Sequence, residues 1–244
     1  MSNIGSKLQE VKRRMATACT AAGRNAEILT SVPALSAPAS GSDRLSLLAV
    51  SKTFPAEAVR EAHAAGQQAF GENYVQEALA KIEALADLRA ELQWHLIGPL
   101  QSNKTRAVAE VFDWVHSVDR LKVAQRLSEQ RPAALAPLQV CLQVNISAEA
   151  SKSGFMAAEV LAAAQAVAAL PRLQLRGLMA IPEPAGDPGA QRLPHRALRE
   201  LLAALNAQGL QLDTLSMGMS ADLEAAVAEG ATVVRVGTAI FGQR

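Results

Sequence analysis

Lys52 stands where a reactive amine would be placed in a parallel α/β protein. It ends the mostly apolar segment 45–52, which is typical of a short buried strand closed by the turn formers of residues 53–55. A helix that starts near Pro55 would leave the amine in a partly desolvated mouth. Desolvation lowers the pKa of a lysine, and the neutral amine is the form that attacks a carbonyl to make an imine. Taken alone, the segment also fits a surface lysine whose charged end reaches into water.

Two segments near the end of the chain carry groups that suit a phosphate. Residues 216–220 (SMGMS) precede a helical pattern, and Ser220 is the expected N-cap of a helix that begins at Ala221. Gly237 and Thr238 lie just beyond the last predicted strand. An anion needs exposed backbone N–H groups, a hydroxyl or a helix N-terminus, and α/β barrels frequently bind phosphate in the loops after their last two strands. Ordinary turn chemistry also explains glycine and serine in either loop.

Arg235 interrupts the apolar run 233–240 and shares strand parity with Gly237. A buried arginine cannot shed its charge, so it must be paired or hydrogen-bonded. Its partner would be the ring nitrogen of a bound aromatic cofactor or a buried carboxylate. The lysine, the phosphate loops and the interior arginine together indicate a ligand with an aldehyde, a phosphate and a pyridine nitrogen. Pyridoxal 5'-phosphate (PLP) has all three.

These groups can meet only in a fold that brings the ends of several strands together. The sequence shows strand and helix patterns in alternation. The predicted strands cover 45–51, 68–72, 92–97, 113–118, 138–145, 173–180, 212–217 and 232–236. The predicted helices cover 3–22, 55–65, 74–90, 102–110, 120–130, 155–169, 190–207 and 220–229. Short strands joined by helical crossovers predict an α/β fold, a single TIM-type (β/α)8 barrel with an extra N-terminal helix. An open doubly wound sheet is the competing fold, but no Gly-x-Gly-x-x-Gly motif follows a strand.

In such a barrel the functional groups lie at the C-terminal ends of the strands. The predicted strand ends supply Lys52, Asn73, His95, Ser117, Asn145, Met179, Ser216 and Gly237. His95 is expected either near the ligand or packed in a layer of the barrel. The other histidines show no metal-ligand spacing, so we expect no metal site.

The composition fits one domain over residues 1–244. Of the 244 residues, 50% are hydrophobic and 19% charged, and the stretch 30–43 predicts a flexible loop within the domain. The net charge of +1 argues against nucleic acid and anionic membranes as partners. Cys19 and Cys141 form no CxxC motif, and no apolar run approaches the ~18 residues of a membrane helix. Without a signal-type block at the N-terminus, we expect a cytoplasmic protein.

Several longer motifs occur in a fixed order along the chain. They are AVSKTFP (49–55), FGENY (70–74), WHLIGPLQSNK (94–104), VNIS (144–147), SKSG (151–154), GLMAIP (177–182), LSMGMS (215–220) and VRVGTAIFG (234–242). With these motifs the chain resembles the pyridoxal phosphate homeostasis protein family from about residue 45 to residue 242.

The resemblance implies a barrel like the N-terminal domain of alanine racemase, with PLP held covalently as an imine on Lys52. It implies that the pyridine nitrogen faces Arg235 and that Asn73 lies near the cofactor. The phosphate-binding residues implied by it are Ser220, Gly237 and Thr238.

Two functions compete for such a barrel. One is a protein that binds PLP and takes part in its intracellular homeostasis and delivery; the other is a PLP-dependent amino-acid racemase or decarboxylase of the alanine-racemase-like class. Racemization needs a base on each face of the substrate, and the resemblance places the base opposite Lys52, a tyrosine, in a further domain. The only tyrosine here is Tyr74. An arginine that faces the ring nitrogen would also leave the ring a poor electron sink.

We therefore expect a carrier without catalytic residues and with at most a weak racemase-like side activity. Its expected partners are PLP and PLP-dependent apo-enzymes, and its expected state is a monomer.

Overall fold

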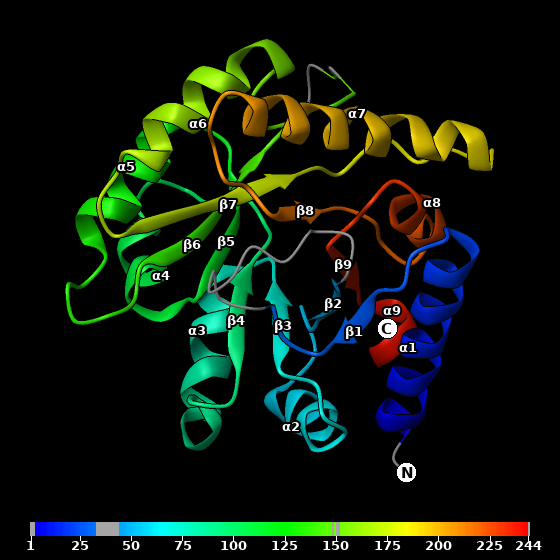
Figure 1. The fold of residues 1–244 in the computed structure, drawn as a ribbon. Coiled ribbons are helices and arrows are strands. Elements are labelled where there is room, and N and C mark those ends of the chain that lie inside the picture. Colours follow the sequence, from blue (N-terminus) through cyan, green and yellow to red (C-terminus); the bar gives the residue numbers. More distant parts are fainter. Residues whose placement is uncertain (1–2, 33–43, 148, 150–151, 244) are drawn as a thin grey trace.

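The fold is a closed parallel barrel with helices around it, seen in a computed structural model that describes residues 3–32, 44–147, 149 and 152–243 (Figure 1). All strand pairs are parallel, and pairing of β2 with β9 closes the barrel. The barrel strands are β2 (Arg44–Val50), β3 (Ala69–Glu72), β4 (Gln93–Leu96), β5 (Trp114–Val118), β6 (Leu138–Gln143), β7 (Leu173–Met179), β8 (Thr214–Ser216) and β9 (Val233–Val236). This confirms the predicted barrel and each of its eight strands.

Helices alternate with the strands, as predicted. They are α1 (Asn3–Ala21), α2 (Ala56–Ala64), α3 (Val75–Ala84), α4 (Thr105–Val111), α5 (Leu121–Gln130), α6 (Val160–Ala168), α7 (Pro188–Ala207), α8 (Leu223–Ala228) and α9 (Thr238–Phe241). Short 3-10 turns η1 (Ala86–Leu88) and η2 (Ala157–Glu159) occupy the end of one predicted helix and the start of another. Within the described residues no helix is long and apolar enough to cross a membrane.

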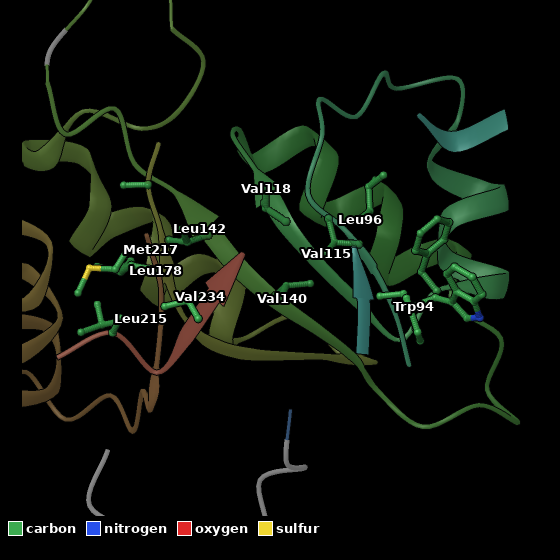
Figure 2. Packing of buried hydrophobic residues seen from close by; sticks show 14 of the residues in the cluster. Trp94, Leu96, Val115, Val118, Val140, Leu142, Leu178, Leu215, Met217 and Val234 are labelled. Carbon is green, nitrogen blue, oxygen red and sulfur yellow. The ribbon is translucent and has the colours of Figure 1, made fainter. Parts of the chain in front are cut away.

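Buried apolar side chains form two layers because neighbouring residues of a strand point to opposite faces. Leu47 and Ala49 belong to the layer between strands and helices, part of which Figure 2 shows. Leu48 and Val50 belong to a smaller cluster with Trp114 that fills the barrel. The strands are therefore buried on both faces, which explains why they appear in the sequence as almost continuous apolar runs.

The chain before β2 departs from the prediction. Residues Glu27–Leu29 form an unpredicted strand, β1, which pairs with the first residues of β2. Val32, which lies within the predicted flexible loop 30–43, is 3% exposed and packs in the cluster that fills the barrel. Its backbone N–H donates to Gln93 Oε1 at 2.8 Å. The loop prediction was therefore wrong for residues 30–32, because tertiary contacts order them; residues 33–43 lie outside the described part of the chain.

Helix α1 covers the side of the barrel where the chain ends. It contacts α8 and α9, and Figure 1 shows it alongside both. Its buried side includes Leu8, Val11 and Met15, at the spacing predicted for one helical face. Helix α9 was not predicted; at four residues it is too short for a periodic pattern.

Candidate cofactor-binding site

A cavity of about 720 Å³ opens at the C-terminal ends of the strands. All six predicted cofactor-binding residues line it: Lys52, Asn73, Ser220, Arg235, Gly237 and Thr238. They come from four separate loop or strand ends of the barrel, so only the closed fold brings them together. Their binding roles stay a prediction.

Lys52 lies two residues after the end of β2 and is exposed. The desolvation expected for this residue was wrong, because its side chain is exposed to solvent. The next residue, Thr53, has φ 69, a left-handed conformation that is rare for a β-branched residue. The Thr53 N–H donates to Glu77 Oε1, which helps to hold this strained turn. The Lys52 amine is thus carried by a turn whose backbone is hydrogen-bonded to helix α3.

A buried ionic group, here called the Lys81 cluster (Ser51, Glu72, Glu77 and Lys81), lies beneath this turn. Lys81 Nζ donates to Glu72 Oε1 at 2.5 Å and to the Ser51 carbonyl at 2.8 Å, and it lies 3.2 Å from Glu77 Oε1. Ser51 Oγ donates to Glu72 Oε1 at 2.6 Å. Burial raises the pKa of the Glu72 carboxyl, an effect that Lys81 and Ser51 only partly offset.

The Lys81 cluster was not predicted from the sequence. Its signal is the position of Lys81 three residues after Ala78, on the side of α3 that also buries Val75 and Ile82. A lysine on an apolar helical face is one of the residues that need a buried partner. The local sequence does not indicate that this partner is Glu72 on β3.

Arg235 is 4% exposed and reaches the cavity from β9. Its Nη1 donates to the Ser216 carbonyl at 2.6 Å and to Ser216 Oγ at 2.8 Å, and its Nη2 donates to the Ala180 carbonyl at 2.9 Å. None of these acceptors is a carboxylate, and among the described residues Nε has no hydrogen-bond partner. Burial lowers the pKa of Arg235 to about 10, so the guanidinium keeps its charge at neutral pH.

A helix was predicted to begin at Ala221 in the loop after β8, and this prediction was wrong. Helix α8 begins at Leu223, so Ser220 lies in the preceding turn and does not cap it. The N-cap position belongs to Asp222, whose side chain bonds outside the helix instead. The prediction failed because a tertiary contact, from Asp222 to His195 on α7, sets where the helix starts.

Asp222 holds this loop through both of its carboxylate oxygens. Oδ1 accepts from the Met219 N–H at 2.7 Å, and Oδ2 lies 2.9 Å from His195 Nε2. Burial acts to raise the pKa of Asp222, but the hydrogen bonds from His195 and Met219 outweigh it and lower that pKa. The carboxylate is therefore charged, and it leaves Ser220 free to face the cavity.

Two glycines let the backbone approach closely at this side of the cavity. Gly218 has φ 89, and a Cβ there would lie 2.5 Å from the Ala226 Cβ. At Gly237 a Cβ would lie 3.0 Å from the Val50 carbonyl oxygen. Gly237 precedes α9, whose first N–H groups have no partner within the helix.

The remaining strand ends divide into two groups. Asn73 lines the cavity, and its buried Oδ1 has no hydrogen-bond partner among the described residues. The strand-end residues that do not line it are His95, Ser117, Asn145, Met179 and Ser216. Of the two places expected for His95, the structure has it packed inside the barrel, stacked on Trp114 at 5.4 Å between ring centroids.

Comparison with known proteins assigns the chain to a family. The family described as "Alanine racemase, N-terminal domain" matches residues 39–244. A Pseudomonas aeruginosa protein named "Pyridoxal phosphate homeostasis protein" is 60% identical over 244 residues, which is 100% of this chain and 97% of that protein. This chain belongs to the pyridoxal phosphate homeostasis protein family.

Solved structures agree with this membership. PipY of Synechococcus elongatus, solved with PLP bound, is 40% identical with a TM-score of 0.74 and covers 93% of this chain and 100% of its own. Alanine racemase from Corynebacterium glutamicum is 22% identical with a TM-score of 0.61, over 82% of this chain and 56% of the racemase. The second likeness shows the fold alone: the homeostasis family and the racemase share a barrel.

Proposed function

We propose that this member of the pyridoxal phosphate homeostasis protein family binds PLP through Lys52 and serves PLP homeostasis and delivery. The observation that carries the proposal is the meeting of an exposed amine, a buried arginine and glycine-containing loops around one cavity. The name of the Pseudomonas aeruginosa relative and the PLP in the PipY structure support it.

The chemistry of the lining residues fits the parts of PLP. When bound, PLP supplies an aldehyde carbon that exchanges between amines as an imine. Lys52 would hold this carbon, and the unpaired Nε of Arg235 would face the pyridine nitrogen. Asn73, with its unpartnered buried Oδ1, supplies a polar group beside the ring. The residues that would hold the phosphate are Ser220, Gly237 and Thr238.

A carrier suits the site better than a racemase or decarboxylase does. Tyr74 is 57% exposed and lies outside the cavity lining, so it is not placed as a second base opposite Lys52. Arg235 keeps its proton, so it would not protonate the ring nitrogen, and an unprotonated ring stabilises a carbanion poorly. The exposure of Lys52 instead suits a protein that loads and releases its cofactor.

The proposal extends to the setting in which the protein works. Both cysteines are free and buried, which suits a reducing compartment such as the cytoplasm. Among the residues that the structure describes, the exposed large apolar side chains, such as Tyr74 and Leu193, come from separate elements and suggest no dimer face. We expect a monomer that hands PLP to apo-enzymes; sedimentation equilibrium and reconstitution of an apo-enzyme are the checks.

The first test is covalent trapping of the cofactor. Incubation of the purified protein with PLP should give a visible imine band that collapses on borohydride reduction, with the pyridoxyl mass on the Lys52 peptide. Lys52→Ala should lose the band and the trapped mass while unfolding at the same urea concentration as the parent protein, because the exposed side chain contributes little to packing.

Lys122→Ala is the matched control. Lys122 is exposed on α5 and lies outside the cavity lining, so its variant should bind and trap PLP normally. Full trapping on another lysine in Lys52→Ala, or no imine in the parent protein, would contradict the proposal. Racemase assays on the PLP-loaded protein, before borohydride reduction, then measure any side activity.

A further inference from the structure

A line of hydrogen bonds runs from Arg235 into the interior of the barrel. Arg235 Nη1 donates to Ser216 Oγ at 2.8 Å, and Ser216 Oγ lies 2.7 Å from His116 Nδ1. His116 Nε2 lies 2.9 Å from His95 Nδ1. The four residues come from β9, β8, β5 and β4, so the line crosses the barrel beneath the cavity.

Counting donors and acceptors gives this line a direction. The guanidinium can only donate, so Ser216 Oγ accepts from it and has its own proton to give to His116 Nδ1. His116 then carries its proton on Nε2 and donates it to His95 Nδ1. In the opposite direction, His116 Nδ1–H would donate to Ser216 Oγ, which already accepts from Arg235. The Ser216 hydroxyl proton would then have no acceptor among the described residues. The hydrogen bonds therefore all point away from Arg235, and both histidines are inferred to be Nε2–H tautomers.

Burial keeps the two histidines of this line, His116 and His95, uncharged. His95, His116 and Ser216 are each 0% exposed. Burial and the nearby charge of Arg235 lower the pKa of His116 to about 3. Burial and His116 lower the pKa of His95 as well. A neutral His116 keeps the lone pair on Nδ1 that accepts the Ser216 proton.

We infer that Ser216 and His116 are positioning residues that orient Arg235 toward the ring nitrogen of the cofactor. The carbonyls of Ser216 and Ala180, together with the Ser216 hydroxyl, engage Nη1 and Nη2, so the guanidinium can turn only by breaking these bonds. Nε is the donor that remains for a ligand in the cavity. His116 fixes which way the Ser216 hydroxyl points and so keeps its lone pairs for Arg235. This inference rests on the proposed function, since it concerns the ligand of that same cavity.

The test removes the hydroxyl that links Arg235 to His116. Ser216→Ala should raise the dissociation constant of PLP by roughly tenfold, the scale of one charge-assisted hydrogen bond. An analogue of PLP with C–H in place of the ring nitrogen should bind the parent protein more weakly than PLP does, and Ser216→Ala should shrink this difference. Ser46→Ala deletes another buried serine hydroxyl, on β2, and should leave both affinities unchanged.

Nitrogen NMR of the histidine side chains reads the line of hydrogen bonds without any cofactor. In the parent protein His116 should be a neutral Nε2–H tautomer, and in Ser216→Ala its Nδ1 signal should shift because the hydrogen bond is lost. A purely structural role for Ser216 would leave the preference for the ring nitrogen unchanged.

The outcomes separate the two proposals. An Nδ1–H tautomer in the parent protein would overturn the inference even if Ser216→Ala does not fold. Equal discrimination of the two ligands by Ser216→Ala and the parent protein would also overturn it, with PLP still trapped on Lys52. Absence of PLP binding by the parent protein would instead overturn the proposed function.

Discussion

At the scale of single residues, Arg235 is a buried charge held without an opposite charge in contact. Its fork of N–H groups meets two carbonyl oxygens and one hydroxyl, which satisfies hydrogen bonds but does not neutralise the cation. Asp222 is the carboxylate whose charge acts on it from a distance. Burial of a cation in this way lowers stability, and we propose that Arg235 serves the ligand of the adjacent cavity.

Replacement of Arg235 should therefore affect both stability and binding. Arg235→Ala leaves acceptors on Ser216 and Ala180 unpaired in the interior, so we expect the free energy of unfolding to fall by about 2 kcal/mol. PLP should bind roughly tenfold more weakly, with a shifted visible spectrum, because the ring nitrogen loses its donor. Urea unfolding and absorbance titration measure the two effects.

Arg176→Ala is the control that separates the loss of stability from the loss of PLP binding in the same experiments. Arg176 is also buried, but it pairs with Asp213 at 2.7 Å and lies outside the cavity lining. Its variant should lose stability and keep its PLP spectrum and affinity. An unchanged spectrum and affinity in Arg235→Ala would remove that residue from the ring-nitrogen role.

At the scale of elements, the C-terminal end of β2 is held by its neighbours rather than by its own sequence. The left-handed Thr53 is tied to Glu77 on α3, and Ser51 is tied to Glu72 on β3. Lys81 joins these contacts from one buried position. The position of Lys52 thus depends on a cluster that is formed by three elements.

Breaking one half of the Lys81–Glu72 pair should destabilise this arrangement strongly. Lys81→Met leaves a buried carboxylate without its cation, and we expect a loss of about 3 to 5 kcal/mol in the free energy of unfolding. Adding Glu72→Gln removes the unpaired charge, so the double variant should be more stable than Lys81→Met alone. Urea unfolding of both single variants and the double variant closes the cycle. Additive losses would show that the two charges do not depend on each other.

The elements themselves were largely predictable, and two of the exceptions, β1 and the start of α8, share one cause. Every barrel strand was found from its apolar run, since burial on both faces leaves a local signature. Strand β1 has only three residues, and its hydrogen bonds come from β2. Helix α8 begins later than expected because Asp222 is engaged by His195. Both errors lie where a partner distant in the sequence determines the local structure.

At the scale of the whole molecule, the buried histidine pair links folding to pH. The pKa of His116 is about 3 in the folded barrel against an ordinary 6.5, so below pH 6.5 the unfolded chain binds a proton that the folded chain does not. Stability must then fall as the pH drops from 6.5 toward 3. His95, whose pKa is lowered in the same direction, adds to the effect.

Urea unfolding at a series of pH values measures this linkage. Between about pH 6.5 and about pH 5 His116 should contribute a loss of about 2 kcal/mol, and His95 should add a loss in the same direction. His116→Leu should make the pH dependence shallower, whereas His63→Gln, which changes a histidine on α2, serves as the reference. A pH dependence that is the same in both variants would contradict the assignment to His116.

The sequence by itself determined the barrel, the strand-end position of Lys52 and the set of residues that meet at the cavity. It did so because buried strands and tight loops have local signatures, and because parallel strands gather their C-terminal ends in one place. Only the tertiary structure decided that Lys52 is exposed, that Lys81 supports its turn and that Arg235 is held by carbonyls and a serine. These features depend on contacts between residues far apart in the chain, such as His116 and Ser216, which are 100 positions apart. No local pattern records such a contact, since it exists only once the barrel has closed.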